Sequence, residues 1–333
     1  MTSTLLRRRR KLAGRRAGRQ RGAALLTAMV IVTLVATLAS AMVWQQWRAV
    51  QVEVAERARA QALWILNGAV DWARLILRED ARTGGADHLG EPWAVPLAEA
   101  KLSTFLAVDR DNTDDAPEAF LSGSIIDAQS RYNLRNLVEA GSGTAGTAEE
   151  RVLQRLLDAV GARSDLAPLI VRGLRAATLA SGQSSGTELS ADPPLMPERI
   201  EQLTWLGLDA ETLALLTPYV SLLPVRTTVN ANTAPKEVLS AVIEGLDLAS
   251  ADRLIQARQR NPFRNVAELG TLLPQGVSAA TERVSVTSSF FEVRGRLRLQ
   301  DRSVEERALV ERRNLDIVTL RRDRVAAIES LTR

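Results

Sequence analysis

The sequence predicts an α+β protein in which a long N-terminal helix is followed by strands, a block of helices and further strands. The helix is predicted by an uncharged apolar run over residues 23–44 that leads into a helical pattern of apolar and polar side chains. Apolar periodicity between residues 148 and 281 predicts the helical block, and alternation over residues 290–299 and 304–313 predicts the closing strands. This order of elements is typical of the α+β class.

The N-terminal apolar run is long enough to cross a membrane. Residues 23–44 contain neither charge nor proline, and 22 helical residues span about 33 Å. Trp44 and Trp47 stand at the end of the run, where aromatic side chains favour the membrane interface. Because nine basic residues precede Gly22, we expect the N-terminus in the cytoplasm and the bulk of the chain on the other side.

The net charge of +4 comes from the first 22 residues. They hold nine of the 43 Lys and Arg residues and no Asp or Glu, which leaves 34 basic against 39 acidic residues, a net charge of −5, in the rest of the chain. A mildly acidic chain is a poor surface for phosphate, so no nucleic-acid partner is expected. The chain has no cysteine and one histidine, His88, in a loop-like sequence, which excludes thiolate sites and makes histidine-based catalysis improbable.

Three interpretations fit the N-terminal segment. A cleaved secretory signal has a shorter apolar region followed by small residues, which Ala39 and Ala41 would mimic. A plain signal anchor fits the length but leaves the glycine at the boundary between charged and apolar residues unexplained. Residues 19–27 resemble a third class, the prepilin leader. We favour this class and predict cleavage between Gly22 and Ala23, so that the apolar helix stays on the mature chain.

The helix is predicted to continue well beyond the membrane. Apolar residues recur at helical spacing with polar residues between them, no proline occurs before Pro92, and Gly84 and Gly85 form a natural stop. One helix of about sixty residues follows from this pattern. An anchor followed by a separate helix is the alternative. The apolar positions of the stripe are Leu63, Leu66, Val70, Ala73 and Leu77.

Asp109, Asp111 and Asp114 lie in an acidic stretch that resembles the opening of a calcium-binding loop. Alternating carboxylates suit a hard cation such as calcium. The glycine and the final glutamate of a complete EF-hand loop are missing, however, and a solvated acidic turn explains the same composition. We favour the turn and keep calcium at these three residues as the alternative.

Composition divides the chain into five segments. Residues 1–22 form the leader, and residues 23–44 form the transmembrane part of the helix. Residues 45–147 contain the rest of the helix and the first strands. Residues 148–283 form the helical block, and residues 284–333 contain the closing strands.

Several motifs together resemble one family over nearly the whole chain, the type II secretion system minor pseudopilin K, also called general secretion pathway protein K. The resemblance implies a pilin-like domain, in which the long helix packs on an antiparallel sheet, with a large all-α insertion. It implies a single-pass protein of the bacterial inner membrane whose bulk is periplasmic. The motifs are residues 21–27, 61–64, 72–74, 87–94, 126–137, 218–220 and 229–235.

The resemblance also implies a role. Family members are non-enzymatic subunits that a prepilin peptidase cuts and N-methylates, here at Ala23. They are thought to cap a short periplasmic pseudopilus together with minor pseudopilins I and J, in protein export across the outer membrane. Members have been seen with calcium, which implies a calcium site somewhere in this chain without assigning it to Asp109, Asp111 and Asp114.

Thr27 departs from the general pilin pattern. It is the fifth residue after the predicted cut, where most pilin-like proteins carry a glutamate. In the family that carboxylate is thought to pair with the free amine of a neighbouring subunit inside the membrane, where an unpaired carboxylate is costly. A threonine at this position is therefore expected in a subunit that has no neighbour to pair with, such as the last subunit at a filament tip.

A rival interpretation comes from residues 232–258, which resemble a helix-hairpin-helix (SAM-like) module. DNA-binding hairpins have the pattern Gly-apolar-Gly, in which bare backbone N–H groups approach a phosphate. Here the hairpin is Gly245-Leu246-Asp247, and a carboxylate about 4 Å from a phosphate costs on the order of a few kcal/mol. We therefore expect a structural or protein-contact module. The alternative function is a membrane-anchored DNA-binding or DNA-uptake protein.

Overall fold

The computed structural model describes residues 21–102, 119–139, 143–180, 194–299 and 302–327. The chain divides into two compact units, Met1–Gln61 and Ala62–Arg333. Helix α1 (Arg21–Thr83) begins in the first unit and ends in the second. Each unit is described by itself below.

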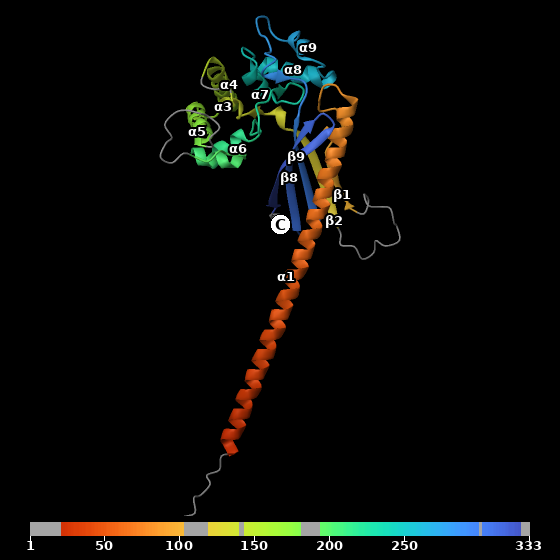
Figure 1. Cartoon of the computed structure of the whole chain (residues 1–333), viewed down its shortest axis with the longest axis vertical. Helices are drawn as coiled ribbons and strands as arrows, with labels where there is room; N and C mark the ends of the chain where they lie inside the picture. The colour runs from red at the N-terminus through yellow and green to blue at the C-terminus, as the bar shows by residue number, and fades with distance from the viewer. Residues whose placement is uncertain (1–20, 103–118, 140–142, 181–193, 300–301, 328–333) are drawn as a thin grey trace, which may run out of the picture. The chain divides into compact units, whose positions relative to one another are not determined.

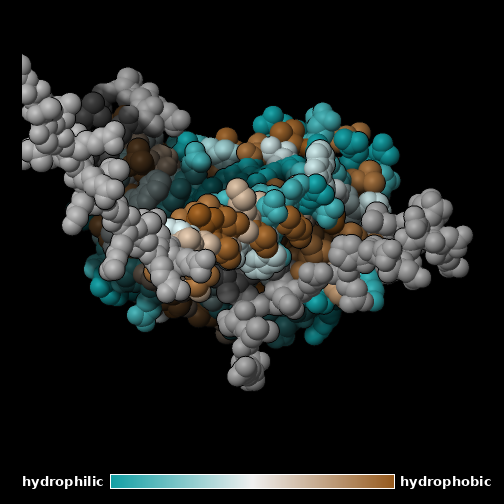
Figure 2. Space-filling model, turned by 90° about the horizontal axis from the view of Figure 1, so that it is seen from below, coloured by the Kyte–Doolittle hydropathy of each residue, from teal (hydrophilic) through white to brown (hydrophobic). Residues whose placement is uncertain are grey.

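The described part of the first unit is helical throughout, and its apolar side chains face outward. Ala23–Thr83 has the length and composition of a membrane span, with a mean hydropathy of 2.3 in its most apolar window. The hydroxyl of Thr27 donates to the carbonyl oxygens of Ala23 and Ala24, at 3.0 and 2.9 Å. Such bonds within the helix satisfy a hydroxyl that has no other partner in lipid. Figure 2 shows the apolar surface of the helix from its N-terminal side.

Helix α1 is continuous over 63 residues, which confirms the prediction of one long helix and excludes an anchor followed by a separate helix. No proline lies within it, and Gly84 and Gly85 follow with positive φ angles of 66° and 121°. Because these backbone conformations suit glycine and not a helix, α1 ends at Thr83.

The second unit contains a five-stranded antiparallel sheet in the order β1-β2-β7-β8-β9. The C-terminal part of α1 lies along one face of this sheet (Figure 1). Leu66 and Leu77 of α1 are fully buried against strand residues such as Val293 and Leu297. The strands are β1 (Leu97–Lys101), β2 (Ala119–Asp127), β7 (Phe290–Leu299), β8 (Arg302–Arg313) and β9 (Asp316–Ala327).

Glycine allows the helix to approach the sheet closely. A Cβ at Gly295 of β7 would lie 3.2 Å from Cδ2 of Leu66, and one at Gly123 of β2 would lie 2.8 Å from the carbonyl oxygen of Arg294. The first contact is with a side chain and the second with backbone, so a side chain at Gly123 would force the β2–β7 pair apart. The contact with α1 therefore depends on Gly295, and the pairing of β2 with β7 depends on Gly123.

A block of helices connects β2 to β7. It contains two short parallel strand pairs, β3 (Tyr132–Asn133) with β4 (Val220–Ser221) and β5 (Val229–Asn230) with β6 (Val284–Ser285). Short 3-10 helices are η1 (Pro92–Ala94), η2 (Ala128–Ser130) and η3 (Ile200–Leu206). The helices are α3 (Asn136–Glu139), α4 (Thr144–Val160), α5 (Leu166–Ala180), α6 (Ala210–Leu216), α7 (Lys236–Val242), α8 (Leu248–Arg260) and α9 (Val266–Gly270).

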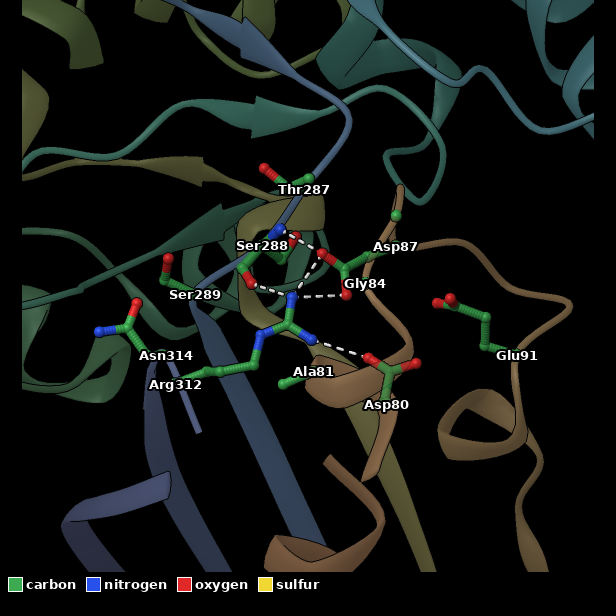
Figure 3. A pocket seen from close by; sticks show the side chains of 11 residues that line it. Asp80, Ala81, Gly84, Asp87, Glu91, Thr287, Ser288, Ser289, Arg312 and Asn314 are labelled. Carbon is green, nitrogen blue, oxygen red and sulfur yellow. Dashed lines mark hydrogen bonds and ion pairs between the residues drawn. The ribbon is translucent and has the colours of Figure 1, made fainter. Parts of the chain in front are cut away.

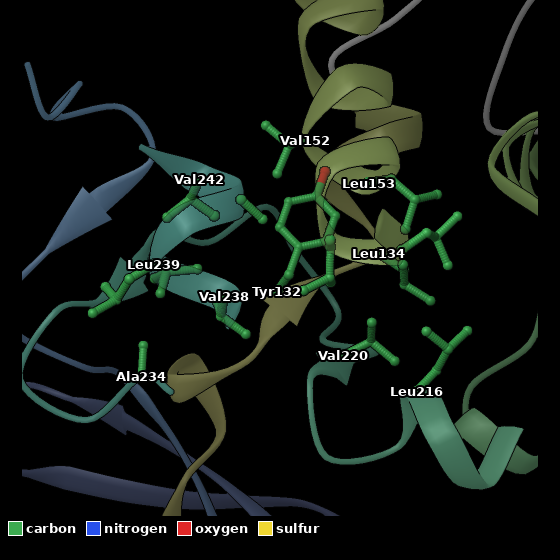
Figure 4. Close-up of a cluster of buried hydrophobic side chains, with 14 of the residues drawn as sticks. Tyr132, Leu134, Val152, Leu153, Leu216, Val220, Ala234, Val238, Leu239 and Val242 are labelled. Carbon is green, nitrogen blue, oxygen red and sulfur yellow. The ribbon is translucent and has the colours of Figure 1, made fainter. Parts of the chain in front are cut away.

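The helical block has a hydrophobic core of its own. Side chains of α4, α6 and α7 meet those of β3 and β4 around Tyr132 (Figure 4). The hydroxyl of Tyr132 donates to Glu149 Oε2 at 2.8 Å, and Arg283 pairs with the same carboxylate at 3.1 Å. The buried Glu149 therefore has both a hydroxyl and a cation as partners, as a carboxylate inside a core requires.

Candidate functional site

The predicted site residues fall in two places. Gly22, Ala23 and Thr27 lie in the first two turns of α1. Asp109, Asp111 and Asp114 lie outside the described residues. Among the described residues, the structure instead brings acidic side chains together where α1 ends and the helical block rejoins the sheet. We call this group the junction site and define it by Asp80, Asp87, Glu91 and Arg312.

The junction site is organised around the guanidinium of Arg312 on β8 (Figure 3). Its Nη1 lies 2.7 Å from Asp80 Oδ2, near the end of α1. Its Nη2 lies 2.6 Å from both carboxylate oxygens of Asp87 and 2.6 Å from the carbonyl oxygen of Ser288. Ser288 N also donates to Asp87 Oδ2 at 2.6 Å. One side chain thus joins the long helix, the loop that follows it and the segment that enters β7.

The guanidinium of Arg312 packs on aromatic side chains. Arg312 lies over the ring of Phe291, with 5.0 Å from the guanidinium carbon to the ring centroid. Phe291 meets Trp93 edge to face at 5.2 Å, and Trp93 Nε1 donates to Glu91 Oε2 at 2.7 Å. Trp93 and Phe291 are both fully buried. Because the ring restricts where the guanidinium can go, the ion pairs with Asp80 and Asp87 have a fixed geometry.

Two carboxylates share the Arg312 cation at this site, and a third, that of Glu91, lies close to them. Burial and, to a smaller extent, the charges of Glu91 and Asp87 raise the pKa of Asp80 to about 6, against the opposing effect of Arg312. Burial also raises the pKa of Asp87, again against the ion pair with Arg312. One oxygen from each of Asp80, Asp87 and Glu91 lies within 4.8 Å of the others, so the cluster could hold a metal ion. Two of these three carboxylates, those of Asp80 and Asp87, already pair with Arg312.

A second buried network ties the helical block to the sheet. The fully buried Asp127, at the end of β2, accepts from Thr233 Oγ1 and Ser288 Oγ, each at 2.6 Å, and from Asn230 Nδ2 at 3.0 Å. Burial raises the pKa of Asp127, while the bonds from Ser288 and Thr233 lower it. Asn230 also donates to the carbonyl oxygen of Asp87 at 3.1 Å. This network therefore adjoins the junction site.

The predicted helix-hairpin-helix is present as α7, Gly245-Leu246-Asp247 and α8. Gly245 has a φ of 81°, and the Asp247 carboxylate accepts from Ser250 N at 2.6 Å, so it caps α8. That bond holds the pKa of Asp247 below its usual value. The carboxylate therefore occupies the N–H group of Ser250 at the start of α8, beside the hairpin where a DNA phosphate would have to bind.

The structure contains a second hairpin of the same kind, which the sequence analysis missed. Gly207 has a φ of 93°, and Asp209 caps α6 by accepting from Thr212 N at 2.7 Å. The tripeptide Gly-Leu-Asp occurs at both hairpins, and this repeat was a signal that could have revealed the first one. In both hairpins an aspartate takes the position of the second glycine of a DNA-binding hairpin.

Family models and individual proteins that are similar to this chain carry the same description. Residues 130–225 and residues 229–287 each match a family described as type II secretion system (T2SS), protein K. The chain is 26% identical to type II secretion system protein K of Pseudomonas aeruginosa, over 94% of this chain and 92% of that protein. It is 27% identical to the protein of the same name from Pectobacterium carotovorum, over 88% of this chain and 92% of that protein.

A solved structure has a similar fold. A chain in the crystal structure of the GspK-GspI-GspJ complex from the enterotoxigenic Escherichia coli type 2 secretion system aligns with a TM-score of 0.62. The alignment covers 82% of this chain and 99% of that chain at 19% identity. The long helix, the five-stranded sheet and the helical block thus form an arrangement already seen in a secretion-system protein.

Replacing Arg312 tests the junction site. Arg312→Gln leaves the buried Asp87 and the largely buried Asp80 without their cation, and we expect the free energy of unfolding to fall by about 3–5 kcal/mol. Arg313→Gln is the matched control, because Arg313 is exposed and its ion pair among the described residues is with its strand neighbour Glu311. It should cost less than about 0.5 kcal/mol. Urea unfolding of the full chain in detergent measures the free energy of unfolding of both variants. Equal decreases would contradict the proposed contribution of the Arg312 ion pairs to stability.

The raised pKa of Asp80 predicts a pH dependence. The pKa of the Asp80 carboxyl is about 6 in the folded chain and 3.8 in the unfolded chain. Its contribution to the free energy of unfolding is therefore fully present below pH 3.8 and is lost as the pH rises to about 6. Asp80→Asn stays neutral throughout. The unfolding free energy of the wild type should therefore decline relative to Asp80→Asn between about pH 4 and pH 6 and then level off. Urea unfolding across that range measures the difference, and a difference that is constant or grows with pH would refute it.

Proposed function

Because this chain belongs to the type II secretion system protein K family and is a structural, non-enzymatic minor pseudopilin, we propose that it caps the tip of the pseudopilus in protein export across the outer membrane. The observation that carries the tip position is the helical block, which is inserted between β2 and β7 beside the end of α1. We expect the bulk of this block to prevent another subunit from stacking on that end of the sheet.

The domain organisation follows from this insertion. We propose that residues 45–147 and 284–333 form a pilin-like domain and that residues 148–283 form the all-α insertion with its helix-hairpin-helix (SAM-like) module. The antiparallel pairing of β2 with β7 supports this division, since strands from both sides of the block lie next to each other in one sheet. Arg312 and Asp127 fasten the insertion where it leaves and re-enters the sheet.

For the N-terminus we propose prepilin processing. The leader, residues 1–22, is removed between Gly22 and Ala23, and Ala23 is N-methylated. The apolar helix then anchors the chain once in the inner membrane, with its N-terminal end cytoplasmic and the bulk periplasmic. Thr27 supports a tip position, because its hydroxyl is satisfied within its own helix and needs no neighbouring amine.

The proposed partners are the other two minor pseudopilins, of types I and J. The related Escherichia coli structure is that of a complex named for GspK, GspI and GspJ, and its fold matches this chain over nearly the whole of that protein. We propose that this chain forms the corresponding complex. A prepilin peptidase is the proposed processing partner.

We propose that calcium binds at one of two groups of acidic residues. Asp80, Asp87 and Glu91 offer hard oxygen ligands of the type that calcium prefers. An ion there would compete with Arg312 for Asp80 and Asp87, and with the N–H groups of His88 and Trp93 for Glu91 Oε2. Asp109, Asp111 and Asp114 are the other group.

The two calcium groups can be separated by binding measurements. We expect the full chain in detergent to bind calcium in equilibrium dialysis. If calcium binds at the junction site, Glu91→Gln should lower the affinity at least about tenfold. If calcium binds at the acidic stretch, the triple variant Asp109→Asn, Asp111→Asn and Asp114→Asn should lower it by at least as much. Wild type that binds no calcium at millimolar concentration would exclude both groups.

The DNA-uptake alternative is less well supported. Asp247 and Asp209 cap the helices of both hairpins, and each places a carboxylate where a phosphate would bind. The buried Arg258 of α8 donates to the carbonyl oxygens of Ala231 and Ala234, at 2.6 and 2.7 Å. Its guanidinium therefore stabilises the loop before α7 and is not presented to a DNA phosphate. Salt-sensitive binding of short duplex DNA by the full chain at micromolar concentration would revive this alternative.

Processing and function can be tested together in a strain that lacks this chain. Mass spectrometry of the wild-type protein extracted from membranes should give a mature chain that begins at Ala23. Gly22→Leu should leave the precursor uncut and abolish secretion of a type II substrate into the medium. Gly18→Leu, which changes a glycine inside the leader and away from the cut, is the control and should be processed normally. Retention of Met1 on a wild type that supports secretion would contradict the processing proposal.

A further inference from the structure

Strand β9 forms one edge of the five-stranded sheet, on the side opposite β1 (Figure 1). The β1 edge is short, with five residues and a register shift against β2, whereas β9 has twelve residues. An edge strand exposes N–H and C=O groups that another strand can bind, so long edges are normally bulged or covered. How β9 is covered therefore decides whether it can accept a further strand.

The pairing with β8 shows which residues of β9 point outward. The N–H of Arg312 donates to the segment that leads into β7, so the even-numbered residues of β8 face β7 and the odd-numbered ones face β9. Arg307 of β8 lies opposite Asp323, which therefore faces β8. Its neighbours Arg322 and Arg324 consequently turn their backbone N–H and C=O groups away from the sheet.

Helix α1 covers only the first part of this outer side. Arg74 Nε donates to the carbonyl oxygen of Ile317 at 2.8 Å, and Arg78 Nε donates to that of Leu315 at 3.1 Å. A one-residue bulge follows, after which residues 321–327 pair with β8 without interruption. No other segment of the part of the chain that the structure describes hydrogen-bonds to the outer backbone of these seven residues. We call residues 321–327 the free edge.

The free edge is basic. Arg321, Arg322 and Arg324 stand in it with one acidic residue, Asp323. The Asp323 carboxylate accepts from Arg321 Nε at 2.8 Å and pairs with Arg199 of the helical block at 2.5 Å. Because two cations already neutralise this carboxylate, the excess charge along the free edge is positive.

The two outward-facing arginines are weakly engaged. Arg322 and Arg324 lie 3.9 and 3.6 Å from the carboxylate of the fully buried Glu306, which accepts no hydrogen bond from either. Arg322 also donates to Asn67 of α1. The side chain of Arg324 is 53% exposed and makes no hydrogen bond to any described residue. Since a guanidinium carries five N–H donors, both side chains can bind further carboxylates.

We infer that the free edge binds an extended segment of another protein that carries acidic residues at alternate positions, and that this segment adds a strand to the sheet beside β9. Its backbone pairs with the outward N–H and C=O groups of Arg322 and Arg324, as in other cases of strand addition. Side chains opposite each other on paired strands lie on the same face, so alternate carboxylates meet the two guanidinium groups.

The charges select this occupant over the others. Arginines on an edge repel apolar and basic strands, which leaves an acidic strand as the favourable one. A second copy of β9 brings its own three arginines to the free edge, and like charges on paired strands are destabilising. Nucleic acid has the negative charge but lacks the regular alternation of backbone donors and acceptors that a strand edge pairs with. The inference does not depend on a tip position in the filament.

The experiment is fluorescence anisotropy of a labelled peptide titrated with the full chain in a neutral detergent. The probe alternates Thr and Glu and is as long as the free edge. One control peptide has the same sequence with N-methyl groups on the glutamate amides, which keeps the charge but prevents strand pairing. A second control alternates Thr and Lys. We expect the probe to bind and both controls to bind at least about tenfold more weakly.

Two results of the peptide titration would overturn the inference. Absence of probe binding at about 1 mM would show that the free edge accepts no such strand. Equal binding of the probe and its N-methylated form would show that charge alone attracts the peptide, without strand addition.

Variants of β9 locate the binding. Arg322→Gln combined with Arg324→Gln should weaken probe binding about tenfold, because two cross-strand charge pairs are lost. Arg324→Pro should abolish it, since proline also removes an outward N–H that β8 does not use. Arg313→Gln is the matched control, because it removes an exposed arginine from the other end of the same hairpin, and it should bind like wild type.

Urea unfolding checks that the variants fold, and the N-methylated peptide decides the matter if Arg324→Pro does not. Hydrogen exchange followed by mass spectrometry should show slower exchange in fragments that cover β9 when the probe is bound to wild type. Binding by the double glutamine variant at wild-type strength, or unchanged exchange in β9, would place the probe elsewhere and overturn the inference.

Two further outcomes would identify another occupant instead. Self-association of wild type in analytical ultracentrifugation that is lost in Arg324→Pro would identify a second copy of this chain. Displacement of the probe by short duplex DNA at the concentration of the probe itself would identify a general polyanion surface. Neither outcome is expected.

Discussion

The arrangement of the second unit depends on the ion pairs that Arg312 makes with Asp80 and Asp87. The end of α1, the loop that follows it and the strand that leaves the helical block all converge on this guanidinium, which rests on Phe291 and through it on Trp93. The cost of burying these charges is offset only when every partner is present. The helical block is therefore fastened to the sheet at the same point at which the long helix ends, and the proposed tip position rests on this placement.

The long helix and the central strands could be predicted because their signals are local. The apolar stripe that includes Leu66 and Leu77, together with the glycines after Thr83, gives the length of α1 directly. From Phe291 to Arg298, strand β7 alternates between buried and less buried residues, because one face of the sheet packs against α1. The short edge strand β1 was missed, since its residues Leu97–Lys101 have weak strand propensity and are held by pairing with β2.

The junction site could not be predicted, because its members are far apart in the sequence. Arg312 lies 232 residues from Asp80 and 225 from Asp87. The motif at residues 87–94 includes Asp87, but a local motif does not indicate which distant cation its carboxylate contacts. The network of Asp127 is similar, since its partners Thr233 and Ser288 come from the helical block and from the segment before β7. The hairpin at Gly207 differs from these cases. Its Gly-Leu-Asp signal was present in the sequence and could have been compared with the hairpin at Gly245.

The central claim is that this chain is the terminal subunit of the pseudopilus, with its helical block preventing further stacking. Immunogold electron microscopy of isolated pseudopili with an antibody against the helical block tests it most directly. A tip subunit predicts label at one end of each filament and none along its length. Label distributed along the filaments would contradict the account, because it would mean that subunits with this insertion stack on one another.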